Sequence, residues 1–185
     1  EMRESDWSSD VCSSDLVTKQ LRTLPDLIGV GAVDALRAMA RGPAGLSIGA
    51  GARLADAFAA LTAFEPGWAG LARRFAGPSV RHTGTLGGNL ANASPIGDLM
   101  PGLIALGARV VLRQGDTLRR LPLEDFYLAY QRTALARGEF IQAVELPPAP
   151  PGRRFRCWKI ARRHDQDISA LCGAFALTLE RGRVD

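Results

Sequence analysis

The chain has 185 residues, 46% of them hydrophobic and 23% charged, a balance typical of a folded protein with one fair-sized core or two small lobes. It contains no apolar run near the roughly 20 residues that span a bilayer and no secretion signal, so we expect a cytoplasmic protein without membrane contact. The net charge of +4 comes from dispersed arginines, which argues against a nucleic-acid partner.

The first sixteen residues, EMRESDWSSDVCSSDL, differ from the rest of the chain. Serine and aspartate dominate them, and they show neither a helical nor a strand period. We therefore interpret residues 1–16 as a leader foreign to the fold, disordered or artefactual, and residues 17–185 as a partial domain.

The first half of that domain predicts two short strands followed by two helices. Residues 24–30 (LPDLIGV) and 45–51 (GLSIGAG) are typical of strands that end at glycine. Residues 53–61 and 67–76 carry apolar side chains at the spacing of one helical face. A Glu-Pro-Gly break at residues 65–67 separates the two helices.

The second half is mainly strand-like. Asp98 is predicted to cap a helix that begins LMPGLIALG, with Pro101 in its first turn, and residues 123–133 also look helical. The predicted strands cover residues 108–113, 117–123, 140–147, 155–162 and 172–180. Because a QGD turn joins the first two strands, we expect an α+β fold with an antiparallel sheet and helices packed on one side.

A stretch rich in glycine, hydroxyl and amide side chains, VRHTGTLGGNLANASPIGD, covers residues 80–98. Gly84, Gly87 and Gly88 permit positive φ, and their successive N–H groups could form an anion-binding nest. The nearby Asp98 carboxylate favours a sugar hydroxyl over a phosphate at its own position. A turn with a purely conformational role is the alternative that these residues leave open.

The metal-binding residue types do not form a site in the sequence. Cys12, Cys157 and Cys172 are odd in number and widely spaced, so they support neither a disulfide framework nor a four-thiolate metal site. His82 and His164 lack further ligands at a useful spacing. We therefore expect no metal on this chain.

Residues 80–112 closely resemble the core motif of the FAD-binding domain of molybdenum hydroxylases, nearest to the small, FAD-binding subunit of bacterial xanthine dehydrogenase. The segments LSIGAG, RRFAGPSVR, LPLEDFYLAY, GEFIQAVELP and KIARRHDQDIS support the same resemblance in the same order. The similarity runs from about Leu24 to Asp185.

The resemblance implies a fold of the two-lobed molybdopterin dehydrogenase/vanillyl-alcohol-oxidase-like type, with FAD held between the lobes. It implies an FAD-dependent oxidoreductase of purine catabolism. In such enzymes a molybdopterin-binding large subunit oxidises the purine, and [2Fe-2S] clusters pass the electrons through FAD to NAD. The molybdopterin and the iron-sulfur domain would lie outside this chain.

The resemblance also implies a set of FAD contacts and no catalytic side chain. These contacts are Phe75, Thr85, Leu86, Gly87, Gly88, Asn89, Asp98, Ile141 and Lys159. From the residues alone, Phe75 and Ile141 are equally typical of core positions, and Lys159 of a charge on an edge strand. The charged loop at residues 162–167 would lie near the flavin, or would be a solvated turn.

The sequence departs from the family pattern at several places. His82 stands where the family commonly has asparagine, and the upstream Gly-Gly-Thr-Asp type loop that grips the FAD pyrophosphate is replaced by the leader. We therefore expect a domain truncated at both ends, without the C-terminal domain that usually follows. The alternatives are a flavoprotein subunit of a carbon monoxide or aldehyde dehydrogenase, or a fragment that no longer binds FAD.

Overall fold

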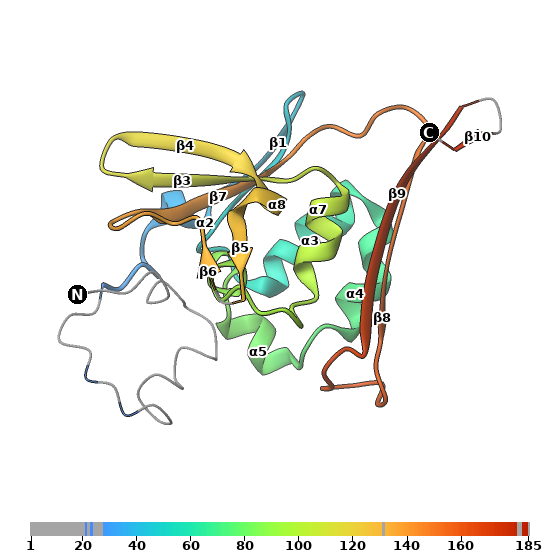
Figure 1. Cartoon of the computed structure of the whole chain (residues 1–185), viewed down its shortest axis with the longest axis horizontal. Helices are drawn as coiled ribbons and strands as arrows, with labels where there is room; N and C mark the ends of the chain where they lie inside the picture. The colour runs from blue at the N-terminus through green and yellow to red at the C-terminus, as the bar shows by residue number, and fades with distance from the viewer. Residues whose placement is uncertain (1–20, 22, 24–27, 131, 181–182, 185) are drawn as a thin grey trace.

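Two antiparallel β layers enclose a group of short helices (Figure 1). The computed structural model describes residues 21, 23, 28–130, 132–180 and 183–184. The helical elements are α2 (Asp34–Arg37), α3 (Leu54–Phe64), η2 (Pro66–Trp68), α4 (Ala69–Arg74), α5 (Pro78–Thr83), α6 (Leu86–Ala91), α7 (Leu99–Ala105) and α8 (Leu123–Phe126). The strands are β1 (Met39–Gly42), β2 (Gly45–Gly49), β3 (Arg109–Gln114), β4 (Thr117–Pro122), β5 (Tyr127–Ala129), β6 (Arg132–Thr133), β7 (Phe140–Leu146), β8 (Arg153–Ile160), β9 (Leu171–Glu180) and β10 (Arg183–Val184).

The first layer is a five-stranded sheet in the order β1-β2-β7-β3-β4, with every neighbouring pair antiparallel. The β3–β4 hairpin turns at Gly115, whose φ of 55° lies in the left-handed region that favours glycine. In β7 the side chains of Ile141, Val144 and Leu146 are buried. These buried apolar residues define the face of the sheet that packs on the helices.

The core between the layers is built around aromatic rings. The Phe58 ring lies 6.3 Å from that of Trp68 and 4.8 Å from that of Phe75, and Trp68 lies 5.3 Å from Phe155 on β8. A Cβ added at Gly67 would come within 2.2 Å of the Phe155 carbonyl oxygen, so η2 approaches β8 more closely than a side chain would allow. These contacts join the helices to the second layer.

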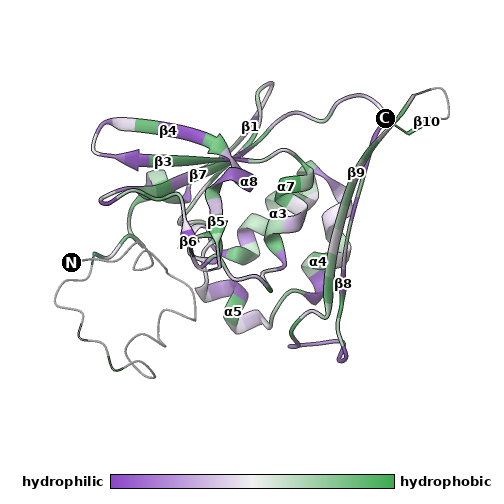
Figure 2. Cartoon of the chain, in the orientation of Figure 1, coloured by the Kyte–Doolittle hydropathy of each residue, from purple (hydrophilic) through white to green (hydrophobic). Residues whose placement is uncertain are grey.

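The second layer is the sheet β10-β9-β8, dominated by the long β8–β9 hairpin. Alternate residues of β8 are buried, among them Phe155, Cys157 and Lys159, and β8 packs on α4 and η2, while α7 packs on β9. Figure 2 shows hydrophobic stretches in α7, which lies between the layers, and along β9. The alternation places Lys159 on the buried face of β8, from which its side chain reaches Asp98, the N-cap residue of α7.

Most of the predicted elements are confirmed, including the α+β class, the helix at residues 53–61 and the β3–β4 hairpin. Two expectations are wrong. The antiparallel strands form separate layers on both sides of the helices rather than one sheet with helices on one side. The helix predicted at residues 123–133 ends at Phe126, because Tyr127 has extended backbone angles. Beyond it, β5 pairs with β6.

The predicted strand at residues 24–30 lies largely outside the described residues, and its last three residues are not in a strand. None of the described helices is long and apolar enough to cross a membrane.

Candidate functional site

The glycine-rich segment folds into helix α6 rather than into an open loop. Thr85 has extended backbone angles and serves as the N-cap, because its Oγ1 accepts a hydrogen bond from the Gly88 N–H at 3.2 Å. Gly84, Gly87 and Gly88 do not use the positive φ that glycine permits. Gly84 instead allows close packing, since an added Cβ would lie 2.9 Å from Leu54 Cδ1.

The anion-binding nest suggested by the sequence does not form, because the first N–H groups of α6 donate to acceptors within the chain. The hydrogen bonds are Leu86 N to Ala52 O at 2.9 Å, Gly87 N to Ala50 O at 2.7 Å and Gly88 N to Thr85 Oγ1 at 3.2 Å. The segment thus ties α6 to the turn that follows β2. Any ligand at this place must be bound mainly by side chains.

Two amide oxygens in this region have no partner among the described residues. Asn89 Oδ1, on α6, and Gln142 Oε1, on β7, are buried and accept no hydrogen bond. The Ala50 N–H donates to the Gln142 backbone carbonyl at 2.9 Å, and the Ala50 carbonyl accepts from the Gly87 N–H. Ala50 therefore links β7, which carries Gln142, to α6, which carries Asn89. A buried acceptor without a donor is costly, and hydroxyl groups of the FAD ribityl and ribose would satisfy it. The two buried acceptors therefore fit the hydroxyl-rich part of FAD.

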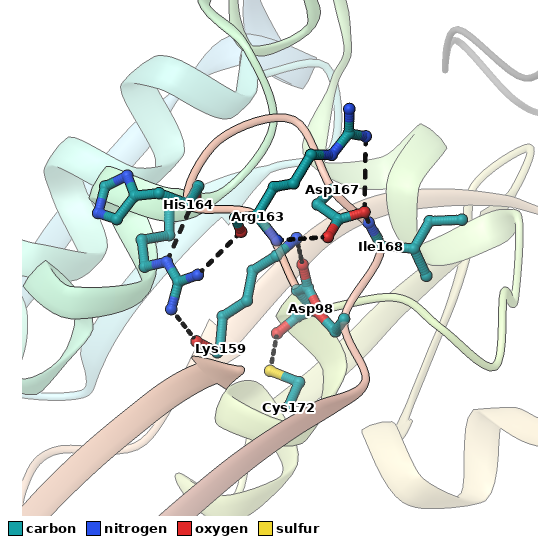
Figure 3. Close-up of polar contacts among 9 residues, drawn as sticks. Asp98, Lys159, Arg163, His164, Asp167, Ile168 and Cys172 are labelled. Atoms are coloured by element: carbon teal, nitrogen blue, oxygen red, sulfur yellow. Dashed lines mark hydrogen bonds and ion pairs between the residues drawn. The ribbon is translucent and has the colours of Figure 1, made fainter. Parts of the chain in front are cut away.

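Asp98 and Lys159 form a buried ion pair between α7 and β8 (Figure 3). Lys159 Nζ lies 2.7 Å from Asp98 Oδ2, and the exposed fractions of the two side chains are 6% and 7%. Asp98 occupies the predicted N-cap position of α7, with Pro101 in the first turn, but its carboxylate does not cap the helix. It turns instead toward the hairpin, where the cation lies.

Ser169 and Cys172 complete the surroundings of Asp98. The Ser169 hydroxyl donates to Asp98 Oδ1, and Cys172 Sγ donates to the Asp98 carbonyl at 3.4 Å. Both Asp98 carboxylate oxygens therefore have donors, which balances the burial of the charge.

The loop between β8 and β9 is exposed at residues 162–166 but internally bonded. The Asp167 carboxylate accepts from the backbone N–H of Arg163 at 2.8 Å and of Ile168 at 3.0 Å. These bonds, the Arg163 bond first, lower the pKa of Asp167. His82 and His164 are both exposed, and no group of three metal-binding side chains occurs among the described residues.

The other predicted contacts lie in the core. Phe75 is 6% exposed, while Leu86 and Ile141 are fully buried. The structure thus brings Asp98 and Lys159 together, and separately places α6 against β7, the strand that carries Ile141. Sequence reasoning missed Gln142 and Ser169, because each acts through a residue more than fifty positions away along the chain.

Comparison with known proteins gives one family and several relatives. A family profile described as the FAD binding domain in molybdopterin dehydrogenase matches residues 13–149. The chain is 33% identical over 153 residues, 76% of its length, to xanthine dehydrogenase/oxidase of Felis catus, and 36% identical over 112 residues, 60% of its length, to nicotinate hydroxylase of Emericella nidulans. It spans only 12% and 8% of these relatives.

The solved structures show the same fold. A chain of the Cu,Mo-containing CO dehydrogenase superposes on 96% of this chain with a TM-score of 0.86 at 24% identity, and this chain covers 62% of it.

Proposed function

Because this chain belongs to the family of FAD-binding domains in molybdopterin dehydrogenases, we propose that it is the FAD-binding, electron-transferring segment of a xanthine dehydrogenase-like molybdenum hydroxylase. The observation that carries this proposal is a buried, unpartnered acceptor together with a buried cation. The unpartnered Asn89 Oδ1 lies in the motif that matches the family, and the Asp98–Lys159 pair supplies a buried cation.

The cofactor supplies the electron-transfer chemistry, while the protein binds and orients it. Asn89 Oδ1 accepts a hydrogen bond from a hydroxyl of FAD. Lys159 has two ammonium protons beyond the one directed at Asp98, and these donate to acceptor atoms of FAD. Asp98 aims the lysine and balances its charge.

The remaining family positions contribute shape rather than charge. Leu86, Gly87 and Gly88 are buried, and the two glycines have no side chain that would keep a ligand away from the backbone. Phe75 and Ile141 belong to the hydrophobic core, so we propose that they support the site through packing. Thr85 fixes the start of α6 and so the direction in which Asn89 points.

We extend the proposal to the complete enzyme. A molybdopterin-binding large subunit and an iron-sulfur domain would supply electrons, NAD would accept them, and the substrate would be a purine in the cytoplasm. The likeness to xanthine dehydrogenase/oxidase at 33% identity supports this choice over the CO dehydrogenase type, whose solved structures are 24–26% identical to this chain.

The test is an absorbance spectrum of the purified chain after mixing with FAD and desalting. The proposal predicts a retained flavin band at about 450 nm. The test variant is Asn89→Leu, which keeps the side-chain size but removes the acceptor. It is expected to retain less FAD than wild type. A wild-type chain that elutes without colour would contradict the proposal.

A further inference from the structure

Arg74, at the end of α4, connects that helix to a segment almost ninety residues later in the chain. Its guanidinium donates to three backbone carbonyls: Lys159 through Nη1, Arg163 through Nη2 at 3.3 Å, and His164 through Nε at 3.4 Å. These acceptors lie at the end of β8 and in the loop that follows it (Figure 3). One side chain therefore fixes both the strand end and the loop.

The loop depends on such polar contacts because it has little apolar burial of its own. Residues 162–166 are exposed, and Ile168 is 65% exposed. Its internal bonds, Arg163 N to Asp167 at 2.8 Å and Ala170 N to Ile160 O at 2.8 Å, shape it but do not attach it to the helices. Segments with few buried apolar contacts open at low free-energy cost. The Arg74 bonds are an attachment to the helical layer that opposes this opening.

The bond to the Lys159 carbonyl bears directly on the ion pair. β8 is the edge strand of its sheet, so carbonyls on its outer side have no neighbouring strand to bond. Arg74 satisfies the outer carbonyl of the residue whose side chain reaches Asp98. The same guanidinium thus fixes the backbone from which the Lys159 ammonium extends.

We infer that Arg74 is a positioning residue of the flavin site: it clamps the end of β8 and the 161–170 loop onto α4, and so holds Lys159 in the orientation that FAD requires. This inference rests on the proposed function, since it assigns Lys159 to the cofactor. Lysine cannot replace Arg74, because a single ammonium lacks the planar fork that reaches three carbonyls.

The experiment compares Arg74→Ala and Arg74→Lys with wild type and with Arg73→Ala, an exposed arginine on the same helix. Trypsin cleavage after Arg162 and Arg163, followed by mass spectrometry, measures opening of the loop. Fluorescence titration measures the Kd for FAD. Both Arg74 variants are expected to be cleaved at least about tenfold faster and to bind FAD at least about tenfold more weakly, while Arg73→Ala matches wild type in both.

Unchanged cleavage in both Arg74 variants would overturn the clamp. Faster cleavage with an unchanged Kd for FAD would overturn the positioning role, because the contact would then serve only the loop. A wild-type chain that binds no FAD would contradict the proposed function instead, and the cleavage rates would still decide whether Arg74 holds the loop.

Discussion

Replacing Lys159 with methionine tests the energetic role of the buried ion pair. The substitution keeps an unbranched side chain of similar length but leaves the Asp98 carboxylate, 7% exposed, with only the Ser169 hydroxyl as a side-chain donor. Breaking a buried pair by removing one partner costs about 3–5 kcal/mol. Since 1 kcal/mol shifts the midpoint by about 2–4 °C in chains of this size, Tm should fall by roughly 6–20 °C.

The assay is thermal and urea unfolding followed by circular dichroism, without FAD. The double variant Lys159→Met with Asp98→Leu should regain most of the loss, because it removes the unpaired charge. Asp34→Asn is the control: its ion pair with Arg37 is exposed, at 92% and 49%, and should contribute at most about 1 kcal/mol. Two results would contradict a stabilising role of the ion pair. One is a loss of less than about 1 kcal/mol in the free energy of unfolding of Lys159→Met. The other is a double variant whose loss equals the sum of the losses of the two single variants.

Three further outcomes are expected. The hydrogen bond from Arg119 lowers the pKa of Glu139 from its usual 4.5, so stability that is present above pH 4.5 should fall as pH drops through the folded-state value; urea unfolding of Glu139→Gln should lack this decline. Burial raises the pKa of Tyr127, so ultraviolet titration should show this phenol ionising above the ordinary tyrosine value of about 10. Stability should fall at high pH as Tyr127 ionises. Tyr127→Phe should lack the high-pH step of the titration. Gly67→Ala places a Cβ 2.2 Å from a backbone carbonyl oxygen and should lower Tm strongly, whereas Gly70→Ala, whose nearest neighbour is at 3.5 Å, should not; equal effects would contradict the packing.

Local sequence patterns predicted the elements that depend on local periodicity. The apolar stripe of α3 and the turn at Gly115 are examples, because burial of one face and a glycine turn are visible within a few residues. The pattern of residues 123–133 is misleading, since Phe126 is buried while Leu128 and Tyr130 are exposed, at 56% and 72%. Helical spacing over eleven residues cannot reveal where burial stops.

The candidate site was less accessible from the sequence. Asp98 and Lys159 were selected by family resemblance, but their ion pair joins residues 61 positions apart. The short polar residues around α6 suggested an open nest, yet their N–H groups are consumed by the turn after β2. Long-range hydrogen bonding of this kind has no local signature.

The most direct test of the central claim is a crystal structure of this chain with FAD. We expect FAD to bind at α6 and the β8–β9 hairpin, with a hydroxyl group within about 3.2 Å of Asn89 Oδ1 and an acceptor atom within the same distance of Lys159 Nζ. FAD bound elsewhere on the chain, or both atoms without contact to a bound FAD, would contradict it.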